Sequence, residues 1–371
     1  MNLRDWLIHK SLPLWKVHGV DQQNGGFYEK LSRHLAPSND PRRARLVARQ
    51  IYFFATGATL GWQGPFEDLL YNGYSYLLNN FVSIDGRVKA TCSPNGITID
   101  GRQHLYDVAF VLLALAKLSD QSEKFLGVED VARLIACRLS NDYSNSEGGY
   151  FDDITPAMQC SNPHMHLFEA FMAWAEYRKP DYNFWLQRAN HCAELALTKM
   201  ILPDLGVLPE YFDSCWKPLP FDGTLSIEPG HQFEWSWLLT RWSNLVGSSE
   251  GLIAAKRLSY IAEKYGVDPK RNAVFERIDQ SMNPLDHTAR LWQQTERLKA
   301  WHSQFAVTSS AVAEQNLAKA FTGLQRFISG PSPGLWFDTM DPVGNFTDED
   351  VKASSGYHLA CAIETISRPL F

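Results

Sequence analysis

The amino-acid sequence predicts an all-α protein in which six helical hairpins close into a ring. Two observations carry this prediction. A short glycine-led turn recurs at intervals of roughly 60 residues, so the 371-residue chain holds six similar units. Between these turns the apolar residues follow a helical period, and extended stretches such as Val207–Phe212 are too short and sparse for a large sheet.

The recurring turn combines glycine with aromatic or acidic residues. Its clearest copies are Gly25–Glu29 and Gly148–Asp152, and the copy that starts at Ala273 is weak because it lacks the glycine. The other copies are Gly86–Val88, Gly206–Glu210 and Gly334–Asp338. Such a period is typical of repeat architectures, so each unit is expected to be one supersecondary element.

Twelve stretches have helical periodicity, two for each unit. They are Asn2–Val17, Arg42–Gly61, Phe66–Phe81, Tyr106–Leu118, Lys124–Leu139, His164–Tyr177, Asp181–Met200, Gly230–Val246, Glu250–Tyr265, Ala289–His302, Ser309–Phe327 and Tyr357–Ser367. Pro180 and Pro229 indicate helix starts, whereas Gly247 and Gly266 follow predicted ends, where a left-handed cap favours glycine. The stretch Tyr106–Leu118 is apolar nearly all round, which predicts burial on both sides.

Six evenly spaced hairpins could form a closed ring or an open solenoid. In a closed ring, six helices line the inside, six lie outside, and the loops at one end form a mouth with short strands or extended loops. An open solenoid would need polar faces on its terminal repeats, but the last stretch, Tyr357–Ser367, is largely apolar. We therefore expect closure. No linker or low-complexity segment interrupts the chain, so residues 1–371 are expected to form one domain.

Composition excludes several classes of partner and location. With 35 basic and 41 acidic side chains the net charge is −6, and no basic block offers a footprint for nucleic acid or a membrane surface. No run of 18 apolar residues could span a membrane, and the first twenty residues lack the pattern of a secretory signal. The six cysteines are scattered without Cys-x-x-Cys pairs, which favours reduced thiols and a cytoplasmic location.

The candidate site residues are polar groups within otherwise apolar helices. Arg49 interrupts an aromatic helix. Its guanidinium there either needs an anionic or oxygen-rich ligand or forms a structural pair with a nearby Glu of the protein. Tyr106 begins the most apolar helix, and its hydroxyl is expected to form a hydrogen bond either within the protein or with a ligand. Asn162 can cap a helix started by Pro163, which places His166 and Glu169 one turn apart.

Histidines near helix starts form the strongest pattern. His231 and Glu234 follow Pro229-Gly230, so both side chains should point into the mouth, with the carboxylate able to orient the imidazole. A core histidine is the alternative interpretation. His166, His231 and His358 each open an expected inner helix, so a closed ring would gather them around one axis. A pair of imidazoles can act as base and acid near neutral pH.

Metal and hydrolase chemistry are less well supported. His164 and His166 form a His-x-His pair, but alternate residues on a helix point about 200° apart, and no third ligand follows at zinc spacing. A metal site is therefore not expected. A glycoside hydrolase on the same barrel needs two carboxylates across the scissile bond, and Glu234 is the only strong candidate, with Glu296 a weaker second. A non-catalytic sugar-binding barrel has no need of facing histidines.

Five motifs, in order, resemble the N-acylglucosamine 2-epimerase superfamily, which includes mannose isomerases and cellobiose 2-epimerases. The motifs are Arg49–Tyr52, Asn162–Ala170, Pro229–Trp235, Trp292–Glu296 and Tyr357-His358. The resemblance covers about residues 5–365 and implies an (α/α)6 barrel. It also implies that His231 and His358 are the acid/base pair and that Arg49 lies near the O1/O2 end of a sugar.

The resemblance assigns the remaining candidates to the pocket. Tyr106, Asn162, His166 and Glu234 would hold sugar hydroxyls or orient the histidines, and Trp292 and Glu296 would form the wall. The Asn-x-His-Met-His form at Asn162 makes an N-acyl sugar a poor candidate, and Ser354 replaces the amide of sulfosugar isomerases. We therefore expect interconversion of D-mannose and D-fructose through a cis-enediolate, without metal or cofactor. The alternative is a 2-epimerase acting on mannose or a mannosyl disaccharide.

Overall fold

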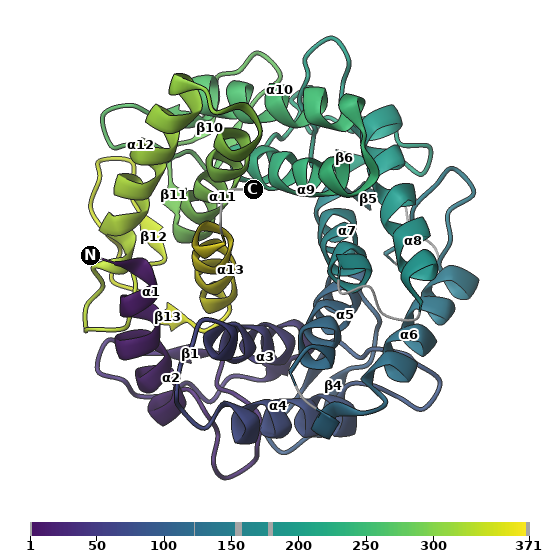
Figure 1. Ribbon diagram of the computed structural model, residues 1–371, viewed down its shortest axis with the longest axis vertical. Coiled ribbons are helices and arrows are strands. Elements are labelled where there is room, and N and C mark those ends of the chain that lie inside the picture. The colour runs from purple at the N-terminus through teal and green to yellow at the C-terminus, as the bar shows by residue number, and fades with distance from the viewer. Residues whose placement is uncertain (1, 122, 153–157, 177–180, 369–371) are drawn as a thin grey trace.

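The computed structural model describes residues 2–121, 123–152, 158–176 and 181–368, and its helices form two concentric rings (Figure 1). The inner ring contains α3 (Ala44–Thr59), α5 (Leu105–Ser119), α7 (Ser161–Glu176), α9 (Pro229–Val246), α11 (Leu291–Thr308) and α13 (Ser355–Ser367). The outer ring contains α1 (Leu3–Trp6), α2 (Leu12–His18), α4 (Phe66–Asn80), α6 (Val128–Asp142), α8 (Tyr182–Leu195), α10 (Ser249–Gly266) and α12 (Ala311–Ile328). A π-helical turn, Leu7–Ser11, joins α1 to α2, and a second one, Ala196–Met200, extends α8. The fold is the predicted (α/α)6 barrel.

The two rings differ in burial, as their sequences require. In α5 every residue from Val108 to Leu118 is buried, because this helix has neighbours on all sides. In α12 the buried residues recur every three or four positions, at Ala313, Asn316, Ala320 and Leu324, and the opposite face is exposed. No helix in the described ranges combines the length and apolar character needed to cross a bilayer.

The ring closes between the last inner helix and the first elements of the chain. Each inner helix contacts the next, and α13 contacts both α11 and α3. The N-terminal helix α1 packs on α13, and Trp15 of α2 stacks on Trp336, with ring centroids 5.1 Å apart. These contacts bury the apolar C-terminal helix that an open solenoid would have exposed.

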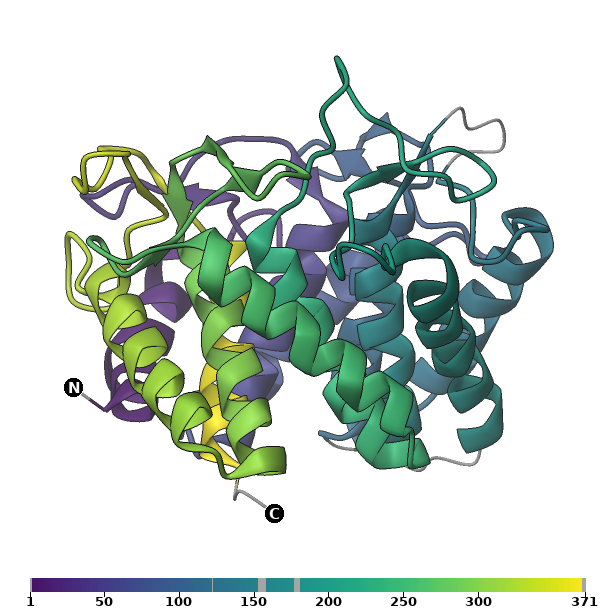
Figure 2. The ribbon, with the colours of Figure 1, turned by 90° about the horizontal axis from the view of Figure 1, so that it is seen from above.

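Short strands join the loops at one end of the barrel, where the outer helices lead into the inner ones (Figure 2). All pairs are antiparallel. They are β1 (Lys30–Leu31) with β13 (Val351–Lys352), β2 (Arg42–Arg43) with β3 (Thr91–Cys92) and β4 (Thr98–Asp100), β5 (Gln159–Cys160) with β6 (Tyr211–Phe212), β7 (Val267–Asp268) with β8 (Ala273–Val274), β9 (Arg277–Ile278) with β10 (Pro284–Asp286), and β11 (Ala289–Arg290) with β12 (Thr339–Met340). Several of these pairs join loops of neighbouring units and so hold the loops of the rim together.

Some helix boundaries differ from the prediction. The stretch from Lys124 is split, because Gly127 is left-handed (φ 89°) and separates a 3-10 turn, Glu123–Phe125, from α6. Ala289 and Arg290 pair with β12, so α11 begins at Leu291. The expected boundaries at Tyr177 and Pro180 lie outside the described residues.

The two predicted glycine caps have different outcomes. Gly247 is left-handed (φ 78°), as predicted, but Gly266 is the last residue of α10 and is not a left-handed cap. A Cβ atom at Gly266 would lie 2.3 Å from Cβ of Pro229, so glycine is required there for close packing against the start of α9.

Candidate active site

A cavity of about 390 Å³ lies among the N-terminal parts of the inner helices and the rim. It is lined by Arg49, Tyr106, Asn162, His166, Glu228, His231, Glu234, Glu276, Arg290, Trp292, Asp338, Lys352, Ser354, Ser355 and His358. Eight of the nine predicted site residues are in this set. Glu296 does not line the cavity and lies behind His358, so its predicted place in the pocket wall is wrong.

His231, in the first turn of α9, is a buried imidazole held by two carboxylates. Its Nδ1 atom lies 2.9 Å from Oε1 of Glu210 and 3.5 Å from Oε2 of Glu228. Burial alone would lower the pKa of His231, but these carboxylates outweigh burial and hold the pKa well above its usual value. His231 is therefore protonated at neutral pH. The expectation that Glu234 orients His231 is wrong, because Glu210 and Glu228 occupy that role.

His358, in the first turn of α13, has the opposite charge state. Its Nδ1 atom lies 3.0 Å from Oε1 of Glu296. Burial, together with the positive charges of Arg49 and Lys299, lowers the pKa of His358 well below its usual value. The ring is therefore neutral at neutral pH, and with Nδ1 facing Glu296 its Nε2 atom is the nitrogen available to a bound molecule.

Trp292 lies beside both histidines. Its ring centroid is 4.9 Å from that of His231 and 5.9 Å from that of His358. A Cβ atom at Gly230 would come within 2.7 Å of the Trp292 ring, so the absence of a side chain at Gly230 lets the indole pack against α9. Trp292 thus holds the spacing of the two imidazoles that share the cavity.

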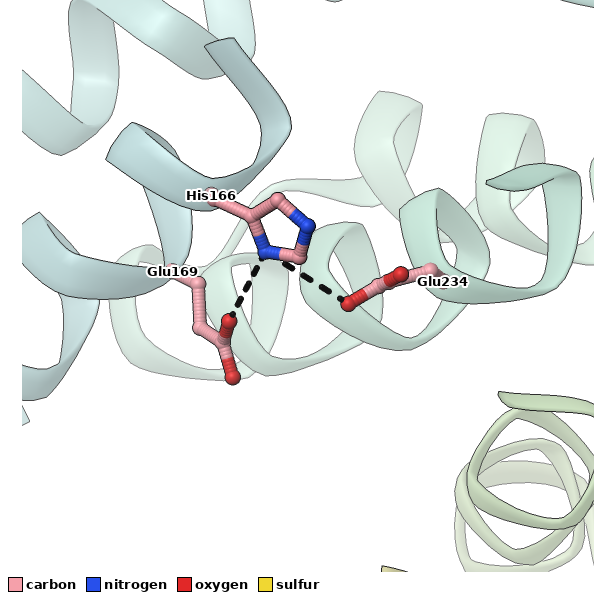
Figure 3. A group of neighbouring side chains, drawn as sticks. All are labelled: His166, Glu169 and Glu234. Carbon is pink, nitrogen blue, oxygen red and sulfur yellow. Dashed lines mark hydrogen bonds and ion pairs between the residues drawn. The ribbon is translucent and has the colours of Figure 1, made fainter. Parts of the chain in front are cut away.

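His166 lies between two carboxyl groups, Glu169 and Glu234 (Figure 3). Its Nδ1 atom is 3.4 Å from Oε2 of Glu169 and 3.8 Å from Oε1 of Glu234. Burial lowers the pKa of His166 to about 4, although Glu169 opposes this shift. His166 lies in the second turn of α7, not the first, but it reaches the same cavity as the other two histidines.

His164 points away from this cavity, as the helical geometry predicts. Its Nδ1 atom donates to the carbonyl oxygen of Cys160 at 2.9 Å, and its Nε2 atom accepts from the Tyr150 amide at 3.0 Å. The His-x-His pair therefore divides into one structural histidine and one that lines the cavity.

Arg49 has no carboxylate partner among the described residues, so the predicted alternative of pairing with a nearby Glu is not observed. Its Nη2 atom donates to the hydroxyl of Tyr106 at 2.6 Å, and its guanidinium carbon lies 4.0 Å from the centroid of the Phe110 ring. A buried guanidinium held only by a hydroxyl and aromatic rings is available to the oxygens of a bound molecule.

Asn162 does not cap α7, because the helix begins at Ser161. The Ser161 amide donates instead to the carbonyl oxygen of Glu210. Oδ1 of Asn162 is buried without a hydrogen-bond partner among the described residues, although the residue lines the cavity. An unsatisfied acceptor in this position is a contact point for a ligand hydroxyl.

Three groups of side chains carry donor atoms suited to a metal ion. They are His166–Glu169–Glu234, Glu210–Glu228–His231 and Glu234–Glu296–His358. The third group already holds a positive charge, because Nζ of Lys299 lies 2.6 Å from Oε2 of Glu296 and 4.0 Å from Oε1 of Glu234. Burial raises the pKa of Glu234 well above its usual value, which favours the uncharged carboxyl.

Sequence reasoning missed several residues at the rim of the cavity. They are Glu210, Glu228, Glu276, Arg290, Asp338, Lys352, Ser354 and Ser355. The repeated turn carried a signal for three of them, because Glu210, Glu276 and Asp338 are its acidic residues. Glu276 accepts from Gln293 of α11, and Asp338 accepts from Ser355 of α13, so these acids support the inner helices.

Comparison with known proteins agrees with this geometry. A model of the N-acylglucosamine 2-epimerase (GlcNAc 2-epimerase) family matches residues 26–362. The chain belongs to this family. Members of the N-acylglucosamine 2-epimerase family are isomerases and epimerases of sugars, so the protein is a sugar isomerase or epimerase.

Relatives named for different activities resemble the chain over nearly its whole length. A protein named mannose-6-phosphate isomerase from Rhizobium meliloti (strain 1021) is 38% identical over 97% of this chain and 95% of its own length. A cellobiose 2-epimerase from Bacteroides fragilis is 23% identical, covering 94% of this chain and 92% of the relative. A solved D-mannose isomerase has the same fold, with a TM-score of 0.89 at 20% identity over 98% of this chain and 97% of that one.

Proposed function

We propose that this enzyme interconverts D-mannose and D-fructose, with His358 as general base and His231 as general acid. The observation that carries the proposal is the opposite charge of two imidazoles that line one cavity and flank Trp292. A neutral imidazole can take a proton, and an imidazolium can give one. The names of the relatives support a sugar isomerase, although the relatives are named for different sugars and different reactions.

The proposed reaction proceeds through an open-chain sugar. As the pyranose opens, His231 donates a proton to the ring oxygen and takes up the proton of the O1 hydroxyl, so it ends protonated as it began. Nε2 of His358 then takes the proton from C2. The resulting cis-enediolate carries negative charge on O1 and O2, next to the unpaired guanidinium of Arg49. Return of the carbon-bound proton to C1 gives the ketose. The net change moves one hydrogen from C2 to C1 and one from O2 to O1.

A 2-epimerase is the second candidate, because the same two histidines could act on opposite faces of C2. Return of a proton to C2 from the side opposite His358 would give D-glucose from D-mannose, or the corresponding change in a mannosyl disaccharide. Incubation with D-mannose in D₂O separates the two reactions. The proposal predicts fructose, with deuterium at C1 in the fraction of turnovers in which the proton held by His358 exchanges with solvent before it returns. Glucose labelled at C2 would establish the epimerase instead, and absence of both products would reject both.

We propose a free hexose, not a sugar phosphate, as the substrate. The cations at the rim are already engaged, because Nη2 of Arg290 lies 2.9 Å from Oε1 of Glu276 and Nζ of Lys352 lies 3.3 Å from Oε2 of Glu349. Glu228, Glu276 and Asp338 also line the cavity and disfavour a dianion. We expect a higher kcat/KM for D-mannose than for D-mannose 6-phosphate, and a preference for the phosphate would contradict this choice.

Two broader proposals accompany the reaction. One continuous apolar cluster runs from Leu3 to Ile363, which supports a single catalytic domain over residues 1–371. All six cysteines are unpaired, which supports a reducing, cytoplasmic location. A monosaccharide is the proposed partner, and neither a nucleic acid nor a membrane is proposed.

A further inference from the structure

Lys299 of α11 is a fully buried charge that does not line the cavity. Its Nζ atom lies 2.6 Å from Oε2 of Glu296 and 4.0 Å from Oε1 of Glu234. The same atom lies 3.6 Å from Sγ of Cys361 and 3.6 Å from the centroid of the Trp237 ring. A buried ammonium is costly unless it is paired, so this contact with Glu296 requires an explanation.

Three buried carboxyl groups lie close to Lys299, and only two have donors that favour ionisation. Glu169 contacts His166, lies near the charge of Lys299 and accepts from the hydroxyl of Tyr357, and together these groups outweigh burial and lower the pKa of Glu169 to about 2. Glu234 has no hydrogen-bond partner among the described residues, and burial raises its pKa. Glu296 receives the ammonium of Lys299, which opposes the rise in pKa that burial causes.

The charge of Glu296 decides which nitrogen of His358 carries the proton. An ionised carboxylate only accepts hydrogen bonds, so Nδ1 of His358 must then donate to it and Nε2 keeps a free lone pair. A protonated Glu296 could instead donate to Nδ1, which would place the ring hydrogen on Nε2. In that tautomer the nitrogen that faces the cavity could not accept a proton.

We propose that Lys299 is a positioning residue that keeps Glu296 ionised and so holds His358 with its hydrogen on Nδ1 and its Nε2 free. This inference rests on the proposed function for its catalytic consequence, because His358 is the proposed base. The state of the imidazole itself does not depend on which sugar is converted. Lys299 does not itself line the cavity. Its charge also lowers the pKa of His358, which favours the same neutral ring, whereas the choice of tautomer is assigned to Glu296.

Lys299→Met removes the charge and keeps most of the side-chain volume. We expect kcat to fall on the order of 10²-fold, the size of a general-base contribution, with KM changed only a few-fold. In protein labelled with ¹⁵N-histidine, the His358 signals should change from the Nδ1–H to the Nε2–H tautomer, with His358→Gln used for assignment. Unchanged signals together with unchanged kcat would overturn the proposal.

Lys117 offers a matched control. It is buried, its Nζ atom lies 2.7 Å from Oε1 of Glu364, and it faces the Tyr52 ring at 5.3 Å. Neither Lys117 nor Glu364 lines the cavity. Lys117→Met should therefore lower stability as any broken buried pair does, while kcat and the His358 tautomer stay unchanged. A similar loss of kcat in both variants would show that Lys299 has only a structural role.

A double-mutant cycle keeps the proposal testable if Lys299→Met alone fails to fold. Glu296→Gln removes the carboxylate, so the Lys299→Met/Glu296→Gln protein has no unpaired buried charge at this pair. Its kcat should equal that of Glu296→Gln within about threefold, because Lys299 has nothing left to hold ionised. A further large loss in the double variant would contradict action through Glu296. If the wild-type enzyme converts no sugar, the proposed function fails, and the tautomer measurement still decides this inference.

Discussion

Oε1 of Glu210 lies 2.9 Å from Nδ1 of His231, and this contact gives the imidazole a carboxylate partner of the kind that His358 finds in Glu296. The two rings nevertheless differ in charge. His231 has a second carboxylate nearby in Glu228, whereas His358 faces the positive charges of Arg49 and Lys299. The carboxylates around His231, Glu210 first among them, and the cations around His358 decide which imidazole is protonated.

Replacing Glu210 by Gln should move the pH profile of the enzyme. Glu210 raises the pKa of His231, and a proton donor loses activity as pH rises through its pKa. The basic limb of kcat/KM against pH should therefore shift to lower pH in Glu210→Gln. Glu349→Gln, at the rim and outside the cavity lining, is the control and should keep the wild-type limb. A basic limb that stays in place in Glu210→Gln would contradict the role of His231 as acid.

A single methyl group at Gly230 should displace Trp292. The new Cβ atom would lie 2.7 Å from the indole and 2.8 Å from Cγ of Gln293, so the ring must move. We expect a loss of about 1–3 kcal/mol in unfolding free energy and at least a tenfold loss in kcat/KM. Gly251→Ala on α10, where the new Cβ atom would be crowded by Ser243 and Trp242 of α9, should lose stability without that kinetic loss. An equal loss of kcat/KM in both variants would contradict this role of Trp292.

The structural histidine His164 should make the fold sensitive to acid. Burial lowers its pKa from 6.5 to about 4, so the unfolded chain binds more protons between these pH values. Stability is therefore complete above pH 6.5 and falls as pH drops toward 4, by roughly 3 kcal/mol from this residue. Urea unfolding at pH 5 and pH 7 should show a smaller pH effect in His164→Gln than in the wild type. An identical pH effect would place the acid sensitivity elsewhere.

The periodicity of the chain was sufficient to predict the barrel, because each unit repeats the same alternation of an all-apolar and a one-sided helix. It also predicted the convergence of His166, His231 and His358, since the first turns of neighbouring inner helices must lie around one axis in a closed ring. The register of the paired strands at the rim could not be predicted. Pairs such as β1 with β13 join residues more than three hundred positions apart, and nothing local specifies their alignment.

The partners of the histidines were the least predictable part of the site. Spacing on α9 favoured Glu234 as the partner of His231, but Glu210 reaches the ring from a rim loop, where sequence spacing carries no information. The repeat did contain a clue, because Glu210 occupies the same place in its turn as Glu29 and Asp338. Glu29 accepts from the amide of Arg43, directly before α3, and Asp338 accepts from Ser355 of α13. The buried link from Lys299 to Glu296 depends on side-chain packing that only coordinates reveal.

The central claim is that a neutral His358 removes the C2 proton of the sugar. The most direct measurement compares D-mannose with D-mannose deuterated at C2, in the wild type and in His358→Asn. The account predicts fructose as the product, a primary isotope effect on kcat/KM in the wild type, and a loss of about 10²–10⁴-fold in the variant. Fructose formed by His358→Asn at the wild-type rate would contradict it.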